Sequence, residues 1–236
     1  MCGIFGAKKF TQFEELYDKN KERGNFSHGF FFTKPDGSMF IRKGSGEYST
    51  EDERVWGHDA EYSTFLGHTQ APTSSTRNFK PTTSHPFEYG SFIVAHNGVL
   101  ENYDDIVDDI LVGHINAVDS SLIPALISFL FEFPEPQSAT DKLVNSNKTE
   151  EVLAIEGACN TIKGTFACWI YSKLTGCTYL VRSGSTLFAN IETGDFSSIR
   201  VPGVCDEELA EGTVYCVTPE GLATCGRFDS SSPFFI

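Results

Sequence analysis

The order of strand-like and helix-like segments is the feature that most constrains how this chain can fold. Apolar runs of strand length come first, helix-like segments gather in the middle, and apolar runs return in the last third. The expected strands cover residues 3–8, 26–33, 39–42, 64–69, 91–95, 165–171, 177–182, 213–217 and 222–225, and the expected helices cover 11–23, 102–111, 119–131 and 149–163. A parallel sheet requires strands and helices to alternate regularly, and these do not. The order therefore predicts an α+β domain in which helices cover antiparallel sheets.

Turn and capping residues mark some of these boundaries. Thr11 and Glu14 have capping-box spacing at the start of the first expected helix, and Gly24 can end it. Residues 70–86 form a long loop rich in Thr, Ser and Pro. Loops of this length in a compact domain are more often functional than idle, so we expect part of the site there.

Composition limits the class of protein. The 236 residues are 40 % hydrophobic and 21 % charged, which suits one packed domain over residues 1–236. Lys and Arg number 18 against 32 Asp and Glu, a net charge of −14, so neither nucleic acid nor an anionic membrane surface is an expected partner. The longest apolar stretch, residues 122–133, is too short to cross a bilayer.

The N-terminus and the cysteines bear on location. The N-terminal residues contain no apolar signal region, which predicts a cytoplasmic protein. The seven cysteines are an odd number without a Cys-x-x-Cys pair. We therefore expect free thiols, with neither a disulfide scaffold nor a zinc site.

Cys2 is the residue with the clearest chemical potential. Removal of Met1 would leave a thiol and a free α-amine on one residue. An α-amine titrates near neutral pH, so it can take the thiol proton and later pass it to a leaving group. Nucleophile and base then come from the same residue. The alternative is a small buried cysteine at the start of a strand.

Six short segments around and beyond Cys2 favour the catalytic interpretation. In this order they resemble the glutaminase domain of class II glutamine amidotransferases, which are N-terminal-nucleophile hydrolases, and in particular the glutaminase half of glucosamine-phosphate synthase. The segments are Cys2-Gly3-Ile4-Phe5-Gly6, Arg23-Gly24-x-x-Ser27-x-Gly29, Gly67-His68-Thr69, Ser84-His85-Pro86, His96-Asn97-Gly98-Val99-Leu100-Glu101-Asn102 and Arg182-Ser183-Gly184-Ser185. The resemblance implies a four-layer α/β/β/α sandwich of two antiparallel sheets.

The resemblance also assigns an oxyanion hole. It implies that the Asn97 side chain and the Gly98 backbone N–H stabilise the negative oxygen that acyl transfer creates. The alternative for this pair is an Asn-Gly hairpin turn. Asp119 resembles the aspartate that binds the α-ammonium group of glutamine. Its other interpretation, a helix N-cap ahead of Ser120, is compatible with that role.

Four further positions are expected around the substrate. Arg23 resembles an arginine that braces the backbone beside the nucleophile, His85 resembles a residue lining the glutamine pocket, and Thr73 can supply a hydroxyl contact. Gln70 stands where the family has an arginine that clamps the α-carboxylate of the substrate. Because glutamine brings no charge, either Arg77 replaces that contact or the preferred substrate is not free glutamine.

The function expected from the resemblance is hydrolysis of the glutamine side-chain amide through a thioester on Cys2, with release of ammonia. No metal or organic cofactor is expected. With no synthase domain expected on this chain, the ammonia acceptor would be a separate synthase, and assembly into a homo-oligomer is left open. Two alternatives stand beside this one: a hydrolase of another amide, and a non-catalytic scaffold with the same fold.

Overall fold

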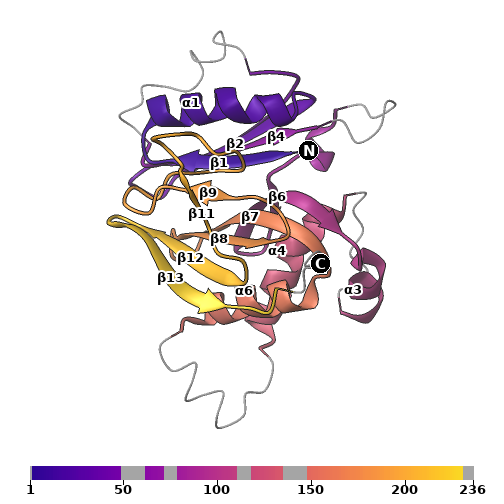
Figure 1. Cartoon of the computed structure of the whole chain (residues 1–236). Helices are drawn as coiled ribbons and strands as arrows, with labels where there is room; N and C mark the ends of the chain where they lie inside the picture. Colours follow the sequence, from indigo (N-terminus) through magenta and orange to yellow (C-terminus); the bar gives the residue numbers. More distant parts are fainter. Residues whose placement is uncertain (1, 49–61, 72–78, 111–117, 135–147, 231–236) are drawn as a thin grey trace, which may run out of the picture.

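Four layers make up the molecule, in the order helix, sheet, sheet, helices (Figure 1). The computed structural model describes residues 2–48, 62–71, 79–110, 118–134 and 148–230. The expected α+β sandwich of two antiparallel sheets is therefore confirmed. Among the described residues, no helix is long and apolar enough to cross a membrane.

The first sheet has seven strands, all antiparallel to their neighbours. Across the sheet the strands are β11 (Glu207–Glu208), β9 (Phe188–Ala189), β10 (Phe196–Ser197), β1 (Gly3–Ala7), β4 (Thr64–Gln70), β2 (Ser27–Thr33) and β3 (Met39–Ser45). The N-terminal strand β1 therefore lies inside the sheet, with a neighbour on each side. This position fixes the residue just before it.

The second sheet has six strands and is also antiparallel. Its strands are β13 (Gly221–Arg227), β12 (Thr213–Thr218), β8 (Thr178–Ser183), β7 (Gly164–Ser172), β6 (Phe92–Leu100) and β5 (Phe87–Tyr89). Strands β6 and β7 pair without interruption from Phe92 opposite Ser172 to Leu100 opposite Gly164. That long pairing carries β6 five residues beyond the expected strand end at Ala95.

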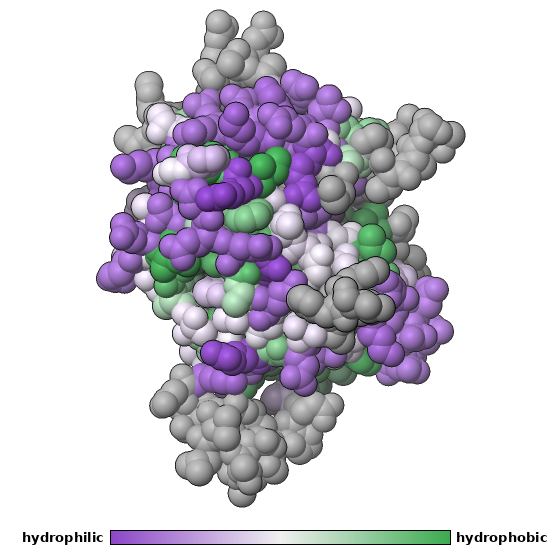
Figure 2. Space-filling model, viewed as in Figure 1, coloured by the Kyte–Doolittle hydropathy of each residue, from purple (hydrophilic) through white to green (hydrophobic). Residues whose placement is uncertain are grey.

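Helix α1 (Phe10–Asn20) covers the first sheet, and α4 (Leu122–Glu132) and α6 (Glu150–Thr161) cover the second. The outer face of α1 is hydrophilic, seen in purple at the top of Figure 2. The remaining helical segments are η1 (Lys21–Arg23), η4 (Pro81–Thr83), α3 (Tyr103–Asp109) and η5 (Asp119–Ser121).

The starts of helices α1 and α6 differ in their N-terminal capping. The expected capping box in the first helix is wrong: α1 begins at Phe10, after Lys9, and has no side-chain cap. The apolar Phe10 and Phe13 pack into the aromatic core beneath the helix, and this packing sets its start. In α6 the Thr149 side chain accepts a hydrogen bond from the Val152 N–H (3.3 Å), as an N-cap should.

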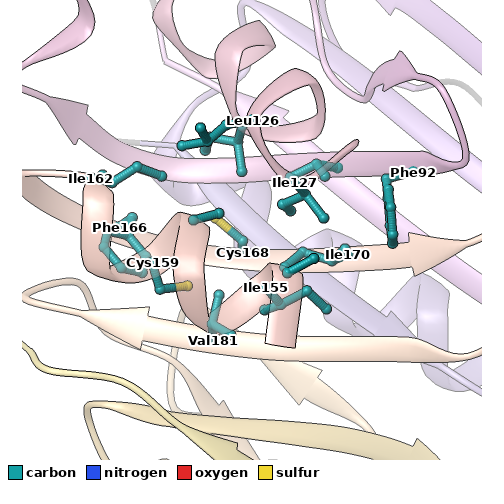
Figure 3. Close-up of a cluster of buried hydrophobic side chains, with 14 of the residues drawn as sticks. Phe92, Leu126, Ile127, Ile155, Cys159, Ile162, Phe166, Cys168, Ile170 and Val181 are labelled. Atoms are coloured by element: carbon teal, nitrogen blue, oxygen red, sulfur yellow. The ribbon is translucent and has the colours of Figure 1, made fainter. Parts of the chain in front are cut away.

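Strand alternation divides the interior into three apolar clusters. Phe5 points from β1 to the α1 side, and Ile4 points into the layer between the sheets. The third cluster fills the space between the second sheet and helices α4 and α6 (Figure 3). Each sheet is thus buried on both faces.

Trp169 of β7 joins the two sheets directly. Its side chain is fully buried in the layer between them, and its indole N–H donates a hydrogen bond to the Gly67 carbonyl of β4 (3.0 Å). A buried indole N–H needs such a partner. The bond fixes how β4 and β7 face one another.

Candidate active site

Cys2 lies directly before β1, and the strand fixes which way it faces. In the β1–β4 ladder, Gly3 is opposite Thr69 and Ile4 is opposite His68, so the next step puts Cys2 opposite Gln70. Alternate side chains share a face, and Ile4 points into the layer between the sheets. The half-buried Cys2 is therefore turned toward the second sheet.

The segment after β10 holds the backbone beside Cys2. Ser198 donates from its N–H to the Ile4 carbonyl (2.8 Å), and its Oγ accepts from the Ile4 N–H (3.0 Å). Arg23 donates to the Ser198 carbonyl (2.7 Å) and to Thr186 Oγ1 (3.0 Å). Arg23 is thus joined through Ser198 to the backbone of Ile4, two residues beyond Cys2.

Arg23 also acts electrostatically on the site. Burial lowers the pKa of Arg23, and its interaction with Cys2 works in the opposite direction. The guanidinium and the thiol are thus close enough to affect each other.

Asn97 and Gly98 lie within β6, opposite Ala167 and Phe166 of β7. The Asn-Gly hairpin turn weighed above is therefore wrong. Asn97 falls on the same face as Ala95, which is in the layer between the sheets. Gly98 has φ +154°, and a Cβ there would lie only 1.9 Å from the Thr165 carbonyl oxygen, so the strand requires glycine at this point.

Asp119 is held against the end of β6. Its Oδ2 accepts from the Leu100 N–H (3.3 Å) and its Oδ1 accepts from the Ser120 N–H (2.8 Å). It is not a helix N-cap, because that position belongs to Val118 for η5 and to Ser121 for α4. The Asp119 carboxylate is thus held at Leu100, two residues beyond Gly98 along β6.

Gln70 and Ser27 extend the row that begins with Cys2. Ser27 is opposite Gln70 in the β2–β4 ladder, and its hydroxyl donates to Gln70 Oε1 (2.8 Å). Gln70 is buried, and its carbonyl end is the one that Ser27 holds. Thr73, expected to contact substrate, and Arg77, the candidate replacement cation, both lie outside the described residues.

Three buried histidines gather in this part of the molecule. The rings of His68 and His85 stack at 3.8 Å, and the ring of His96 lies 6.5 Å from His85. His68 Nε2 lies 3.2 Å from the His96 carbonyl, and burial lowers the pKa of His68 to about 3. His68 is thus neutral and bonds within the core.

His85 reaches this position because Gly29 makes room for it. A Cβ at Gly29 would lie 1.9 Å from the His85 carbonyl oxygen, so only glycine allows this close approach. The segment ahead of β5 therefore packs directly on β2. His85 is brought to the same part of the interior as His68, which lies two residues along β4 from Gln70.

Sequence reasoning overlooked His96 and Ser120 as site residues. His96 Nδ1 lies 2.9 Å from Ser120 Oγ, directly behind Gly98 and beside Asp119. The available signal was their position, immediately before Asn97 and immediately after Asp119.

A cavity of about 270 Å³ lies at the other end of the layer between the sheets, where β1 ends and β4 begins. Its lining includes Lys8, Thr64, Leu66 and Phe196, and none of the residues expected at the site. Within the described ranges, no three His, Cys, Asp or Glu side chains converge as metal ligands.

Comparison with known proteins places this geometry among relatives. No protein-family model matches the sequence. The chain is 26 % identical over 201 residues to a glutamine–fructose-6-phosphate aminotransferase (isomerizing) of Streptococcus pyogenes, covering 82 % of this chain and 31 % of the relative. It is 25 % identical over 185 residues to a 7-cyano-7-deazaguanine synthase of Saccharolobus solfataricus, covering 73 % of this chain and 36 % of the relative. The chain thus spans about a third of the length of these curated relatives.

Solved structures share the fold. The glutamine phosphoribosylpyrophosphate amidotransferase of B. subtilis superposes with a TM-score of 0.64 at 19 % identity, over 97 % of this chain and 49 % of that one. A glutamine aminotransferase class-II domain protein of Silicibacter pomeroyi superposes with a TM-score of 0.56 at 14 % identity, over 97 % and 99 % of the two chains. The chain is thus similar in sequence to a glutamine–fructose-6-phosphate aminotransferase, and it shares its two-sheet sandwich fold with solved glutamine amidotransferase structures.

Proposed function

We propose that this chain hydrolyses the side-chain amide of glutamine with Cys2 as the nucleophile. The observation that carries the proposal is the way the two sheets pack. Cys2, next to the first sheet, and Asn97, in the second, are both turned into the layer between the sheets. Glutamine as the substrate is supported by the names of the relatives, which describe enzymes that take nitrogen from glutamine.

The chemistry starts once Met1 has been removed. The α-amine of Cys2 takes the thiol proton, and the Cys2 sulfur attacks the amide carbon of the substrate. The Asn97 side chain and the Gly98 N–H stabilise the oxyanion. The C–N bond then breaks, the protonated α-amine gives its proton to the leaving nitrogen, and ammonia departs. Water attacks the remaining thioester, which releases glutamate and restores the thiol.

The substrate's amino-acid end is held by residues around this centre. Asp119 supplies a negative charge for the α-ammonium group, and its bonds to Leu100 and Ser120 orient it. His85 lines the pocket, and Gln70 holds the carboxyl end. Arg23 supports the nucleophile by bracing Ser198.

The ammonia then passes to a separate synthase that uses it as a nucleophile. The same proposal includes this partner and action as a single domain over residues 1–236. It also includes a cytoplasmic location, because Cys2 stays reduced there. Ammonia transfer is measurable as incorporation of ¹⁵N from the glutamine side chain into a product of the acceptor enzyme.

A second function, hydrolysis of a different amide, is favoured by one observation. Gln70 lies opposite Cys2, and Ser27 holds the carbonyl end of the Gln70 side chain. The α-carboxylate of glutamine would need a positive charge at this position. The Gln70 side chain can donate a hydrogen bond but brings no charge to balance a carboxylate, whereas a neutral carbonyl needs no such charge. A panel of glutamine, asparagine, γ-glutamyl amides and N-acyl amino acids separates the two functions, and a Gln70→Arg variant should lower the KM for glutamine.

The decisive experiment measures glutamate release from glutamine by protein whose loss of Met1 is verified by intact mass. Cys2→Ala should abolish release, and its N-terminus can still be processed because alanine is small. Cys216→Ala removes a half-buried thiol from β12 instead and should leave release unchanged. Full activity of Cys2→Ala would refute the mechanism. Inactivity of the Met-free protein on every amide of the panel would favour the scaffold.

A further inference from the structure

A continuous polar connection runs behind the Asn97–Gly98 segment. His96 Nδ1 lies 2.9 Å from Ser120 Oγ, and the Ser120 hydroxyl donates to Asp119 Oδ1 (3.3 Å). Asp119 Oδ2 in turn accepts from the Leu100 N–H (3.3 Å). The connection thus leaves β6 at His96, passes through η5, and returns to β6 at Leu100, enclosing the two proposed oxyanion donors.

The ring of His96 also touches the backbone that it flanks. A Cβ at Gly98 would lie 2.8 Å from His96 Nε2, so the ring packs directly behind this glycine. His96 and Ser120 are both almost fully buried, at 2 % and 4 % exposure. Packing and burial together leave the Gly98 backbone little room to move away from its place.

The protons on this connection can be assigned. Burial lowers the pKa of His96, so the ring is neutral near pH 7 and carries one proton, although Asp119 works in the opposite direction. Its two ring contacts are Ser120 Oγ at 2.9 Å and the Thr165 carbonyl at 3.4 Å. Because the Ser120 hydroxyl gives its one proton to Asp119 Oδ1, it accepts from His96, and Nδ1–H is the donor to Ser120 Oγ.

We infer that His96 is a positioning residue, which acts through the Ser120 hydroxyl to fix the Asn97–Gly98 segment relative to Asp119. The inference rests on the proposed function, in which that segment stabilises the oxyanion and Asp119 binds the α-ammonium group. Neither His96 nor Ser120 touches the substrate in this arrangement. Their effect is to fix the position of the oxyanion donors relative to Asp119.

The neighbouring Ser121 provides a comparison for the role of the Ser120 hydroxyl. The Ser121 hydroxyl donates to the Val118 carbonyl (2.8 Å) within its own turn. Ser120 and Ser121 are equally buried, and removal of either hydroxyl deletes the same atom from the same turn. The Ser120 hydroxyl contacts His96 of β6 and the Ser121 hydroxyl bonds to Val118, so Ser121→Ala is the matched control for loss of a buried hydroxyl from η5.

The kinetic test compares these serine variants in Met-free protein. Ser120→Ala should lower kcat for glutamine roughly tenfold, the effect of losing one hydrogen bond that matters in the transition state. KM should stay within about twofold, because Asp119 keeps its two backbone donors. Ser121→Ala should leave both constants within about twofold. Equal losses in the two variants, or a loss confined to KM, would overturn the inference.

A second pair of variants tests the ring. His96→Asn places an amide nitrogen where Nδ1 lies and keeps the donor to Ser120, whereas the equally sized His96→Leu removes it. We expect His96→Leu to lose at least roughly tenfold in kcat and His96→Asn to recover most of it. Melting temperatures show whether both variants are folded. Equal kcat values for two folded variants would contradict a role through Ser120.

A spectroscopic measurement separates this inference from the proposed function. In ¹H–¹⁵N spectra of the full chain without substrate, Ser120→Ala should shift the Gly98 amide resonance and speed its hydrogen exchange, and Ser121→Ala should do neither. If the wild-type protein releases no glutamate, the proposed function fails, and these spectra still decide the positioning role. An unmoved Gly98 resonance in Ser120→Ala would refute it.

Discussion

The buried ring of His68 should make the stability of this protein depend on pH. Burial lowers its pKa from 6.5 to about 3, and its contact with the His96 carbonyl only partly offsets this. Between these two pKa values the unfolded chain binds a proton that the folded protein does not. Stability is therefore complete above about pH 6.5 and falls as the pH is lowered toward 3.

The size of the effect follows from the two pKa values. Each pH unit inside the window changes the free energy of unfolding by about 1.4 kcal/mol. His68 alone should thus cost about 2 kcal/mol between pH 7 and pH 5, and about 4 kcal/mol by pH 3. Burial lowers the pKa of His96 as well, so His96 adds to the same trend.

A substitution that keeps the donor but cannot titrate isolates the contribution of His68. His68→Gln can still reach the His96 carbonyl and carries no proton equilibrium. Urea unfolding at pH 7 and pH 5 gives the two free energies for each protein. The decrease on going to pH 5 should be smaller by about 2 kcal/mol in His68→Gln than in the wild type. Equal decreases in the two proteins would refute the argument, whatever their stabilities at pH 7.

Three further predictions concern the site and the core. Asn97→Ala should lower kcat for glutamine by about 10²–10³, measured as glutamate release, because an oxyanion donor is lost; a fall of less than about tenfold would rule that role out. Gly98→Ala should lower both the melting temperature and kcat, because the new Cβ would lie 1.9 Å from the Thr165 carbonyl oxygen; a normal melting temperature would show that β6 and β7 can separate at this point. Glu151→Ala should cost at least about 3 kcal/mol in urea unfolding, since its buried carboxylate accepts from three hydroxyls, whereas the exposed Glu150→Ala should cost less than about 1 kcal/mol; similar costs would contradict this account.

The fold was largely predictable because its main signals are local. Apolar runs bounded by turn residues located β1, β2, β4 and β7, and their order indicated antiparallel sheets. The two-residue strands β9, β10 and β11 were missed, since so short a strand exists only through its neighbours.

The site was less predictable because its geometry depends on pairing between distant strands. Nothing local in the sequence shows that β7 keeps pairing with β6 through Gly98, so a turn there was a reasonable alternative. Likewise, that Gln70 lies opposite Cys2 follows only from the register of β1 and β4. The connection from His96 to Ser120 joins residues 24 positions apart. The motifs predicted which residues form the site, and the strand pairing determines which of them are neighbours.

The bond from Trp169 to Gly67 gives this protein its own optical reporter. The chain has two tryptophans, and Trp169 is fully buried at the contact between the sheets that carry Cys2 and Asn97. Exchange of Trp56 for phenylalanine would leave Trp169 as the single source of indole emission. Any loosening between the sheets would let water reach the ring and move its emission to longer wavelength, so fluorescence can report whether the two halves of the site remain docked.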